Sequence, residues 1–284
     1  MRLTIILLTL FVTINVQSQA NDFEGAAYNI GIGSVFSSIG AIINKKEDVT
    51  LGATIKKSLW QGAVGGYINF EAKRLLRKNI YNDQWYYYWA ANTLNCIGSS
   101  ITENAAYNRG MFEQLNWHIA FMRLEFKLKN NLKVHPKFML VETGSFLYNA
   151  SKFNFEAKQS LKTGHMIFSA DYLGHNIYAL HNAGNILVIK SQLTDERNYV
   201  HEIIHRYQRD NYIALNSYYT PSIKNWLKNY KWGRFLNNHT YLDFHNLIIS
   251  AVSYSLSESN DEYYDNMFEH EAGYYSHTLY FYNN

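Results

Sequence analysis

The sequence predicts an α+β fold, in which an N-terminal helical region rich in small residues precedes a central antiparallel or mixed β-sheet and a set of C-terminal helices. Three changes of pattern along the 284 residues support this prediction. Glycine and aromatic residues are frequent up to about residue 110, short apolar segments bounded by turn residues follow up to about residue 190, and helical periodicity returns after that. We therefore divide the chain into residues 1–20, 21–110 and 111–284.

Residues 1–20 have the pattern of a secretory signal peptide. Arg2 gives a positive start, an apolar run extends from Ile5 to Val16, and Ser18-Gln19-Ala20 is a small-x-small cleavage site. The apolar run is shorter than the roughly 20 residues that cross a bilayer. We expect export to the periplasm or outer cell envelope, or secretion, as a mature chain of about 264 residues.

Residues 21–110 are expected to form a compact helical region. Glycine recurs within 30–43 and 59–68, at spacings that include three, four and seven residues. Small residues at such spacings let helices approach closely, in membranes and in soluble helix pairs alike. Membrane association through residues 25–110 and packing in solution are both open expectations.

Short strands are expected between Leu115 and Ile189, because apolar and β-branched segments alternate with proline and glycine turns. Their number predicts a sheet of about five or six strands. The strand-like segments are 118–126, 137–141, 146–148, 165–168 and 185–189.

A helix is expected directly after the last of these strands. Thr194-Asp195-Glu196 supplies a capping residue and acids for its first turn. An apolar stripe at i, i+3, i+4 and i+7 should face the core. A separate face carries His201, His205 and Gln208 at i, i+4 and i+7. The stripe consists of Val200, Ile203, Ile204 and Tyr207. A second long amphipathic helix is expected over Tyr241–Leu256.

The helix after the last strand contains the pattern H-E-x-x-H, His201-Glu202-Ile203-Ile204-His205. Two imidazoles four residues apart lie on one helix face, where both can bind a single ion. In this pattern the histidines bind zinc, and the glutamate, here Glu202, acts as general base on water. A catalytic zinc also needs a third protein ligand.

Glu269-His270-Glu271-Ala272 offers that ligand, and with it the chain resembles the gluzincin group of zinc metallopeptidases. The resemblance covers roughly residues 185 to 276. It implies that residues 111–284 form a zincin-like metallohydrolase domain with Glu269 as third ligand and Glu271 as the alternative. It also nominates Tyr275 and His277 as groups that stabilise an oxyanion. The sequence departs at Gly273, where many relatives carry an acid that supports a ligand histidine.

Other third ligands remain open. They are His239, Asp243, His245, His270 and His277. A metzincin site is excluded, because Gln208 and Asn211 occupy the glycine and third-histidine positions of that motif.

We expect an exported zinc-dependent hydrolase, most readily a metallopeptidase that acts on a peptide or protein substrate. The alternative is an aromatic-rich envelope protein that binds or scaffolds, with a structural or vestigial metal site; 24 Tyr and 6 Trp suit such contacts. A net charge of +3 without a basic motif gives no indication of nucleic-acid binding. The single cysteine, Cys96, excludes a disulfide within the chain.

Overall fold

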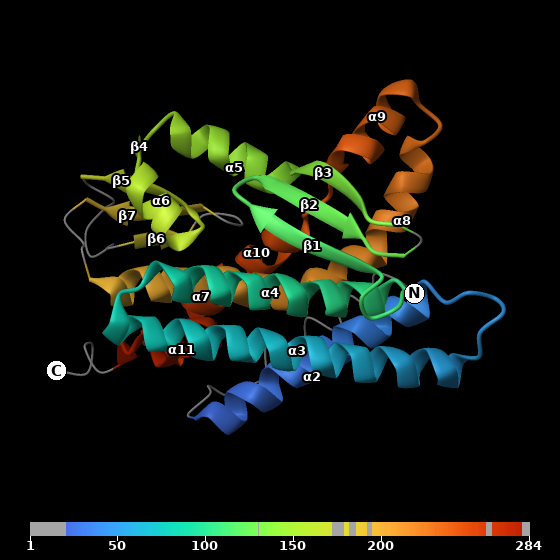
Figure 1. The fold of residues 1–284 in the computed structure, drawn as a ribbon, viewed down its shortest axis with the longest axis horizontal. Coiled ribbons are helices and arrows are strands. Elements are labelled where there is room, and N and C mark those ends of the chain that lie inside the picture. The colour runs from blue at the N-terminus through green and yellow to red at the C-terminus, as the bar shows by residue number, and fades with distance from the viewer. Residues whose placement is uncertain are drawn as a thin grey trace.

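The computed structural model describes residues 21–129, 131–171, 179–181, 186–191, 195–259 and 263–279. The predicted signal peptide, residues 1–20, lies outside the described residues. Helices at both ends of the described chain, with two small mixed sheets between them, confirm the predicted α+β class (Figure 1).

The N-terminal region consists of three helices, α2 (Asp22–Ile43), α3 (Leu51–Asn82) and α4 (Trp85–Ala106). Several of their glycines lie where the helices touch. A Cβ on Gly62 would lie 2.2 Å from the carbonyl oxygen of Gly33 on α2. A Cβ on Gly98 would lie 2.7 Å from that of Gly65 on α3. The helices therefore meet backbone to backbone, which is what small residues at these spacings allow.

Helix α2 is long and apolar enough to cross a membrane by length and composition, with a mean hydropathy of 1.5. It is the one helix among the described residues that meets this test, and half of its apolar window is buried in the protein. A buried core helix can have the same composition, so membrane association through residues 25–110 stays a prediction.

The described strands form two four-stranded sheets rather than the single sheet expected. The first sheet has the order β1 (Gln114–Ile119), β2 (Met122–Lys127), β3 (Lys133–Met139) and β8 (Thr240–Tyr241). The second has the order β4 (Asn154–Phe155), β5 (Met166–Ala170), β7 (Ile186–Lys190) and β6 (Ala179–His181). Each sheet is mixed, because β3 and β8 run parallel, as do β5 and β7.

Two strand predictions need correction. The segment 118–126 is a hairpin, because the chain reverses at Ala120, which has a φ of 52°. The segment 146–148 belongs to helix α5 (Leu140–Ala150). The carboxylate of Asp243 accepts hydrogen bonds from the first free backbone N–H groups of α5, at 2.8 Å from Val141 N. A residue about a hundred positions away thus caps this helix.

The helix that carries the H-E-x-x-H pattern is α7 (Glu196–Asn211). It begins as predicted, with the side chain of Asp195 accepting a hydrogen bond from Arg197 N, while Thr194 lies outside the described residues. The predicted apolar stripe is confirmed, because all four of its side chains are fully buried. They pack in one core with Phe70, Leu76 and Tyr88 of α3 and α4. This core therefore includes residues from both sides of the predicted boundary at residue 110.

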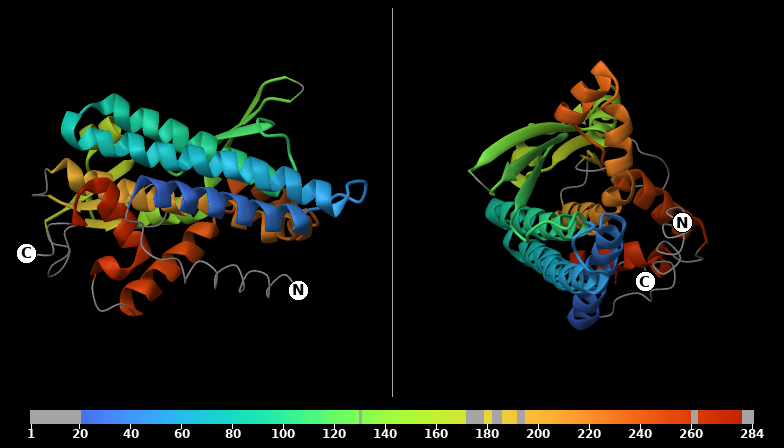
Figure 2. Two further views of the ribbon diagram at one scale, coloured as in Figure 1. Left: turned by 90° about the horizontal axis from the view of Figure 1, so that it is seen from below. Right: turned by 90° about the vertical axis from the view of Figure 1, so that its right-hand side faces the viewer.

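The remaining helices are α6 (Ala157–Thr163), α8 (Asn216–Leu227), α9 (Lys231–His239), α10 (His245–Ser259) and α11 (Met267–Ser276), with short 3₁₀ turns at Ile213–Leu215 and Tyr263–Asp265. Helix α10 begins at His245, so the prediction of a helix from Tyr241 was wrong at its start. Figure 2 shows the long helices α3 and α4 as one layer, with α8 and α9 rising from the body. Helix α7 packs on that layer, and α11 packs against both α7 and α3.

Candidate metal centre

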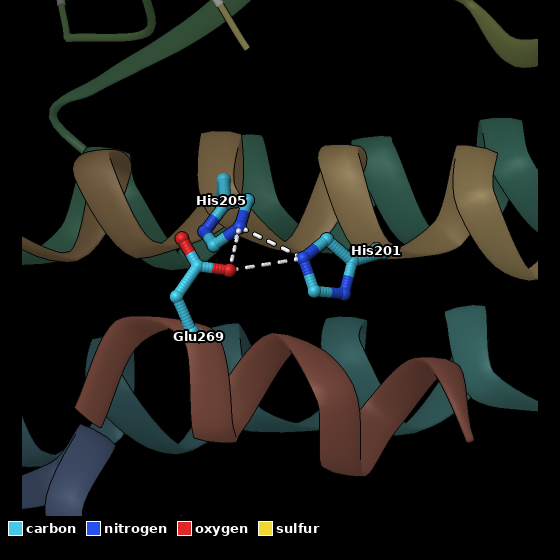
Figure 3. A group of neighbouring side chains, drawn as sticks. All are labelled: His201, His205 and Glu269. Carbon is cyan, nitrogen blue, oxygen red and sulfur yellow. Dashed lines mark hydrogen bonds and ion pairs between the residues drawn. The ribbon is translucent and has the colours of Figure 1, made fainter. Parts of the chain in front are cut away.

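Three side chains from α7 and α11 converge at the contact between these helices (Figure 3). His201 and His205 lie on one face of α7, and Glu269 comes from the first turn of α11. His201 Nε2, His205 Nε2 and Glu269 Oε2 form a triangle whose three sides are each 3.1 Å. All three side chains are nearly buried, at 8–12% exposure.

The triangle has a size that suits zinc. In a tetrahedral site with bonds of about 2.0–2.1 Å, two ligand atoms lie about 3.3–3.4 Å apart. The observed separations of 3.1 Å are close to this value. Two imidazoles and one carboxylate are also the ligand types that catalytic zinc sites use. The residues therefore fit a zinc ion in both chemistry and spacing.

The outer nitrogen of each imidazole is held by another side chain. His205 Nδ1 lies 2.8 Å from Gln208 Oε1. The Gln208 amide nitrogen donates to Phe268 O at 2.8 Å, which leaves its oxygen facing His205. In the neutral ring Nδ1 is then the protonated nitrogen, and Nε2 keeps its lone pair for a metal. His201 Nδ1 lies 3.3 Å from the hydroxyls of Ser276 and Thr278.

Glu271, the alternative third ligand, lies outside the triangle and has a different set of contacts. Its carboxylate accepts a hydrogen bond from Gln208 Nε2 at 2.9 Å and forms a buried ion pair with Lys73 Nζ at 2.8 Å. Asn29 also donates to it at 3.2 Å. Glu271 thus holds Gln208, which in turn holds His205. Lys73 of α3 is thereby connected to His205 of the candidate metal centre through Glu271 and Gln208.

Gly273 is the position where the resemblance leads one to expect a supporting acid, and the structure has no room for one. A Cβ there would lie 2.6 Å from Tyr264 Cε1 and 2.7 Å from Leu279 Cδ2. Ser276 and Thr278 support His201 instead. Sequence analysis missed both. Ser276 follows Glu269 by seven residues, so the two lie on one helix face. This spacing could have indicated from the sequence that Ser276 lies near the metal ligands.

Glu202 is buried beside the triangle, with 7% exposure. Burial raises the pKa of its carboxyl, and the nearby charge of Glu269 raises it further. The imidazoles of His205 and His201 lower this pKa but do not cancel the rise. A carboxylate with a raised pKa is a better proton acceptor at neutral pH than a free one.

Within the triangle, the pKa of Glu269 is lowered and the pKa of His205 is raised. Burial disfavours the Glu269 carboxylate, yet His205 and His201 hold its pKa well below the ordinary value. Burial also lowers the pKa of His205, but the carboxylates of Glu269 and Glu202 outweigh it and raise that pKa to about 9. Glu269 is therefore ionised, and the His205 ring is protonated below about pH 9.

The two residues nominated for oxyanion stabilisation have their described contacts elsewhere. The Tyr275 ring is fully buried in the core around α7, with the Arg77 guanidinium 5.4 Å from its centroid. His277 ends α11 in the left-handed conformation, with a φ of 56°, and its ring packs edge-on against Tyr81 at 5.6 Å. Neither has a described hydrogen bond to the triangle, so both roles stay predictions.

Three of the rival third ligands, Asp243, His245 and His239, have their described contacts elsewhere. Asp243 caps α5, and His245 bonds Asn216 Nδ2 through its Nδ1 atom at 2.8 Å. The ring of His239 lies against Phe235 on α9. Among the described residues, the one group of histidine and acidic side chains that converges as metal ligands is His201, His205 and Glu269. In comparisons with protein-family models, with curated proteins and with solved structures, nothing matches this chain.

Proposed function

We propose that the protein is an exported zinc-dependent hydrolase and that its substrate is a peptide or protein. The proposal rests above all on one observation, the triangle of two imidazole nitrogens and a carboxylate oxygen at 3.1 Å. Each imidazole of this triangle is also oriented from behind by a polar side chain. That combination is typical of metal ligands and their supporting residues.

His201, His205 and Glu269 would hold the ion, and these three are the described ligands. Three protein ligands leave a fourth position for water or substrate, as in catalytic rather than closed structural sites. Bound Zn²⁺ would polarise a carbonyl and make water a stronger nucleophile. Glu202 would accept the proton of the attacking water and pass it to the leaving amine.

The metal assignment is tested by elemental analysis of the purified mature chain. Wild type should carry about one zinc ion per chain, and the double variant His201→Ala, His205→Ala should carry almost none. His239→Ala is the matched control, because His239 is exposed on α9 and should leave zinc unchanged. Equal zinc in wild type and the double variant would refute the proposal.

The role of Glu202 is tested with quenched fluorescent peptide libraries. Glu202→Gln should keep its zinc and lose hydrolysis by a factor of about a hundred or more. Glu142→Gln is the matched control. Like Glu202, Glu142 is a buried carboxyl whose pKa is raised, here by burial and by Asp243, but it lies on α5 rather than on α7. Unchanged hydrolysis in Glu202→Gln would exclude a general base at this position.

The scaffold alternative predicts a closed site. Replacing zinc by cobalt and recording the visible spectrum distinguishes the two hypotheses, because an open site changes its spectrum when azide or a hydroxamate enters the fourth position. A spectrum insensitive to both probes would favour a structural metal and contradict the proposed hydrolase.

A further inference from the structure

Helices α8 and α9 form a hairpin that stands out from the body of the protein beside β3 (Figure 1). The two helices touch closely near the tip. A Cβ on Gly233 would lie 2.1 Å from the carbonyl oxygen of Leu227, so only glycine fits there. The start of α9 therefore packs directly on the end of α8.

Four large aromatic side chains lie exposed on this hairpin, and three of them, Trp226, Tyr230 and Trp232, contact one another at its tip. Trp226 and Tyr230 have ring centroids 5.3 Å apart, and Tyr230 and Trp232 lie 5.6 Å apart. The exposed fractions are 55% for Trp226, 42% for Tyr230, 54% for Trp232 and 62% for Phe235. An exposed cluster of large apolar side chains is uncommon on a soluble surface and indicates a contact with something else.

The charge around this cluster has one sign. No aspartate or glutamate occurs from Asn211 to Leu242, although the whole chain has almost as many acidic as basic residues, 23 against 26. The basic residues of this stretch are Lys224, Lys228, Lys231 and Arg234. Within the part of the chain that the structure describes, none of the four is in an ion pair.

Positive charge continues from the foot of the hairpin onto the first sheet. A pocket of about 600 Å³ opens there, lined by Thr220, Pro221 and Lys224 of α8 and by residues of the sheet. Six basic and three acidic side chains line it, which leaves an excess of positive charge. The basic ones are Arg109, Arg123, Lys127, Lys129, Lys137 and Lys224, and the acidic ones are Glu103, Glu113 and Glu125.

We propose that the α8–α9 hairpin docks the protein on an anionic lipid bilayer, with Trp226, Tyr230, Trp232 and Phe235 entering the headgroup region. Tryptophan and tyrosine favour the membrane interface, because their rings combine an apolar body with a polar edge. Exposed lysine and arginine residues attract anionic headgroups. This inference uses residues outside the metal centre, and it stands or fails independently of the proposed hydrolase.

Vesicle co-sedimentation of the mature chain tests the proposal. Wild type should bind vesicles with 30% phosphatidylglycerol and bind pure phosphatidylcholine much less. The triple variant Lys228→Gln, Lys231→Gln, Arg234→Gln should bind about a hundredfold more weakly, at about fivefold per charge. The double variant Trp232→Ala, Phe235→Ala should also bind at least tenfold more weakly. All five side chains are exposed, so zinc content and thermal unfolding should match those of wild type.

The matched controls lie in the N-terminal region, on α3 and in the connection between α2 and α3. One is Lys45→Gln, Lys46→Gln, Lys56→Gln, and the other is Trp60→Ala, all of them exposed. Both should bind like wild type. Loss of binding in these controls with binding kept in the hairpin variants would overturn the proposal in favour of residues 25–110. Equal binding to neutral and anionic vesicles would also overturn the proposal. So would no binding to either, which is the result expected if the hairpin binds a protein partner instead.

Discussion

Two clusters of buried polar side chains flank α7, and they are balanced in different ways. On one face, Arg206 pairs with Asp210 at 2.7 Å. Nearby Arg123 lies between Glu103 and Glu125. Each of these three acids, Asp210, Glu103 and Glu125, has a cation supplied by the chain. On the other face, Glu269 has two imidazoles and, among the described residues, no lysine or arginine within ion-pair distance.

This difference separates a structural cluster from a binding one. A buried charge is costly unless it is paired, so the first cluster holds the fold together by its own charges. In the triangle, the compensating positive charge among the described residues is instead a proton on the His205 ring, whose pKa Glu269 raises to about 9 against the effect of burial. Under the proposed function a metal ion would displace that proton. We therefore expect mutations in the first cluster to affect folding, and mutations in the second to affect metal affinity.

The largest expected effect is on the structural cluster. Arg123→Met removes a cation that is 1% exposed and leaves Glu103 without its ion-pair partner. The free energy of unfolding should fall by about 3–5 kcal/mol, measured by urea denaturation. Lys129→Met is the matched control, because its pair with Glu113 is 66% exposed on the lysine side and should be worth less than about 1 kcal/mol. A loss of unfolding free energy below about 1 kcal/mol in Arg123→Met would contradict the assignment of this cluster to holding the fold together.

The next effect is the pH dependence of the triangle. The pKa of His205 is raised to about 9, above its ordinary 6.5, so the proton on its ring stabilises the metal-free fold below pH 6.5. That contribution is lost as the pH rises through 9. Zinc must displace this proton, so its affinity should rise about tenfold per pH unit between 6.5 and 9. Competition with a chromogenic chelator at several pH values measures this, and a flat profile would contradict it.

A smaller effect is expected when the support of His205 is removed. Gln208→Ala deletes the amide that orients its Nδ1 atom, and zinc affinity should fall about 10- to 100-fold. Chelator competition gives the affinity, and urea denaturation of the metal-free protein gives the stability. A variant that loses stability but binds zinc as tightly as wild type would assign Gln208 to the structural cluster instead.

The smallest effect is expected for Ser276→Ala. The hydroxyls of Ser276 and Thr278 lie at the same distance, 3.3 Å, from His201 Nδ1. Thr278 therefore remains as a partner, and zinc affinity should fall less than for Gln208→Ala. Ser276→Ala combined with Thr278→Val should match the loss for Gln208→Ala. If the combined variant binds zinc like wild type, His201 needs no support from these hydroxyls.

Sequence reasoning succeeded where the determining interactions are local. The start of α7, its apolar stripe and the strand before it are all set by neighbours within a few residues, and the structure confirms them. The convergence of Glu269 with the two histidines also agrees with the sequence expectation, because a known spacing pattern guided it.

It failed where distant residues decide. Asp243 caps α5 from about a hundred residues away, so no local pattern shows that 146–148 is helical. The ion pair that holds Glu271 away from the triangle joins it to Lys73 across 198 positions of sequence, so no local pattern shows it. The edge of the first sheet is completed by β8, which pairs with β3 from about a hundred residues further along the chain.

The pairing of Lys73 with Glu271 also ties completion of the candidate metal centre to completion of the fold. The last helix must reach the first half of the chain before Gln208, His205 and Glu269 are all in place. A nascent or unfolded chain offers two histidines on a short segment and binds zinc weakly. If the chain crosses a membrane unfolded, as the proposed export implies, zinc would be acquired at its destination, and the supply of zinc there would decide how much of the proposed hydrolase forms.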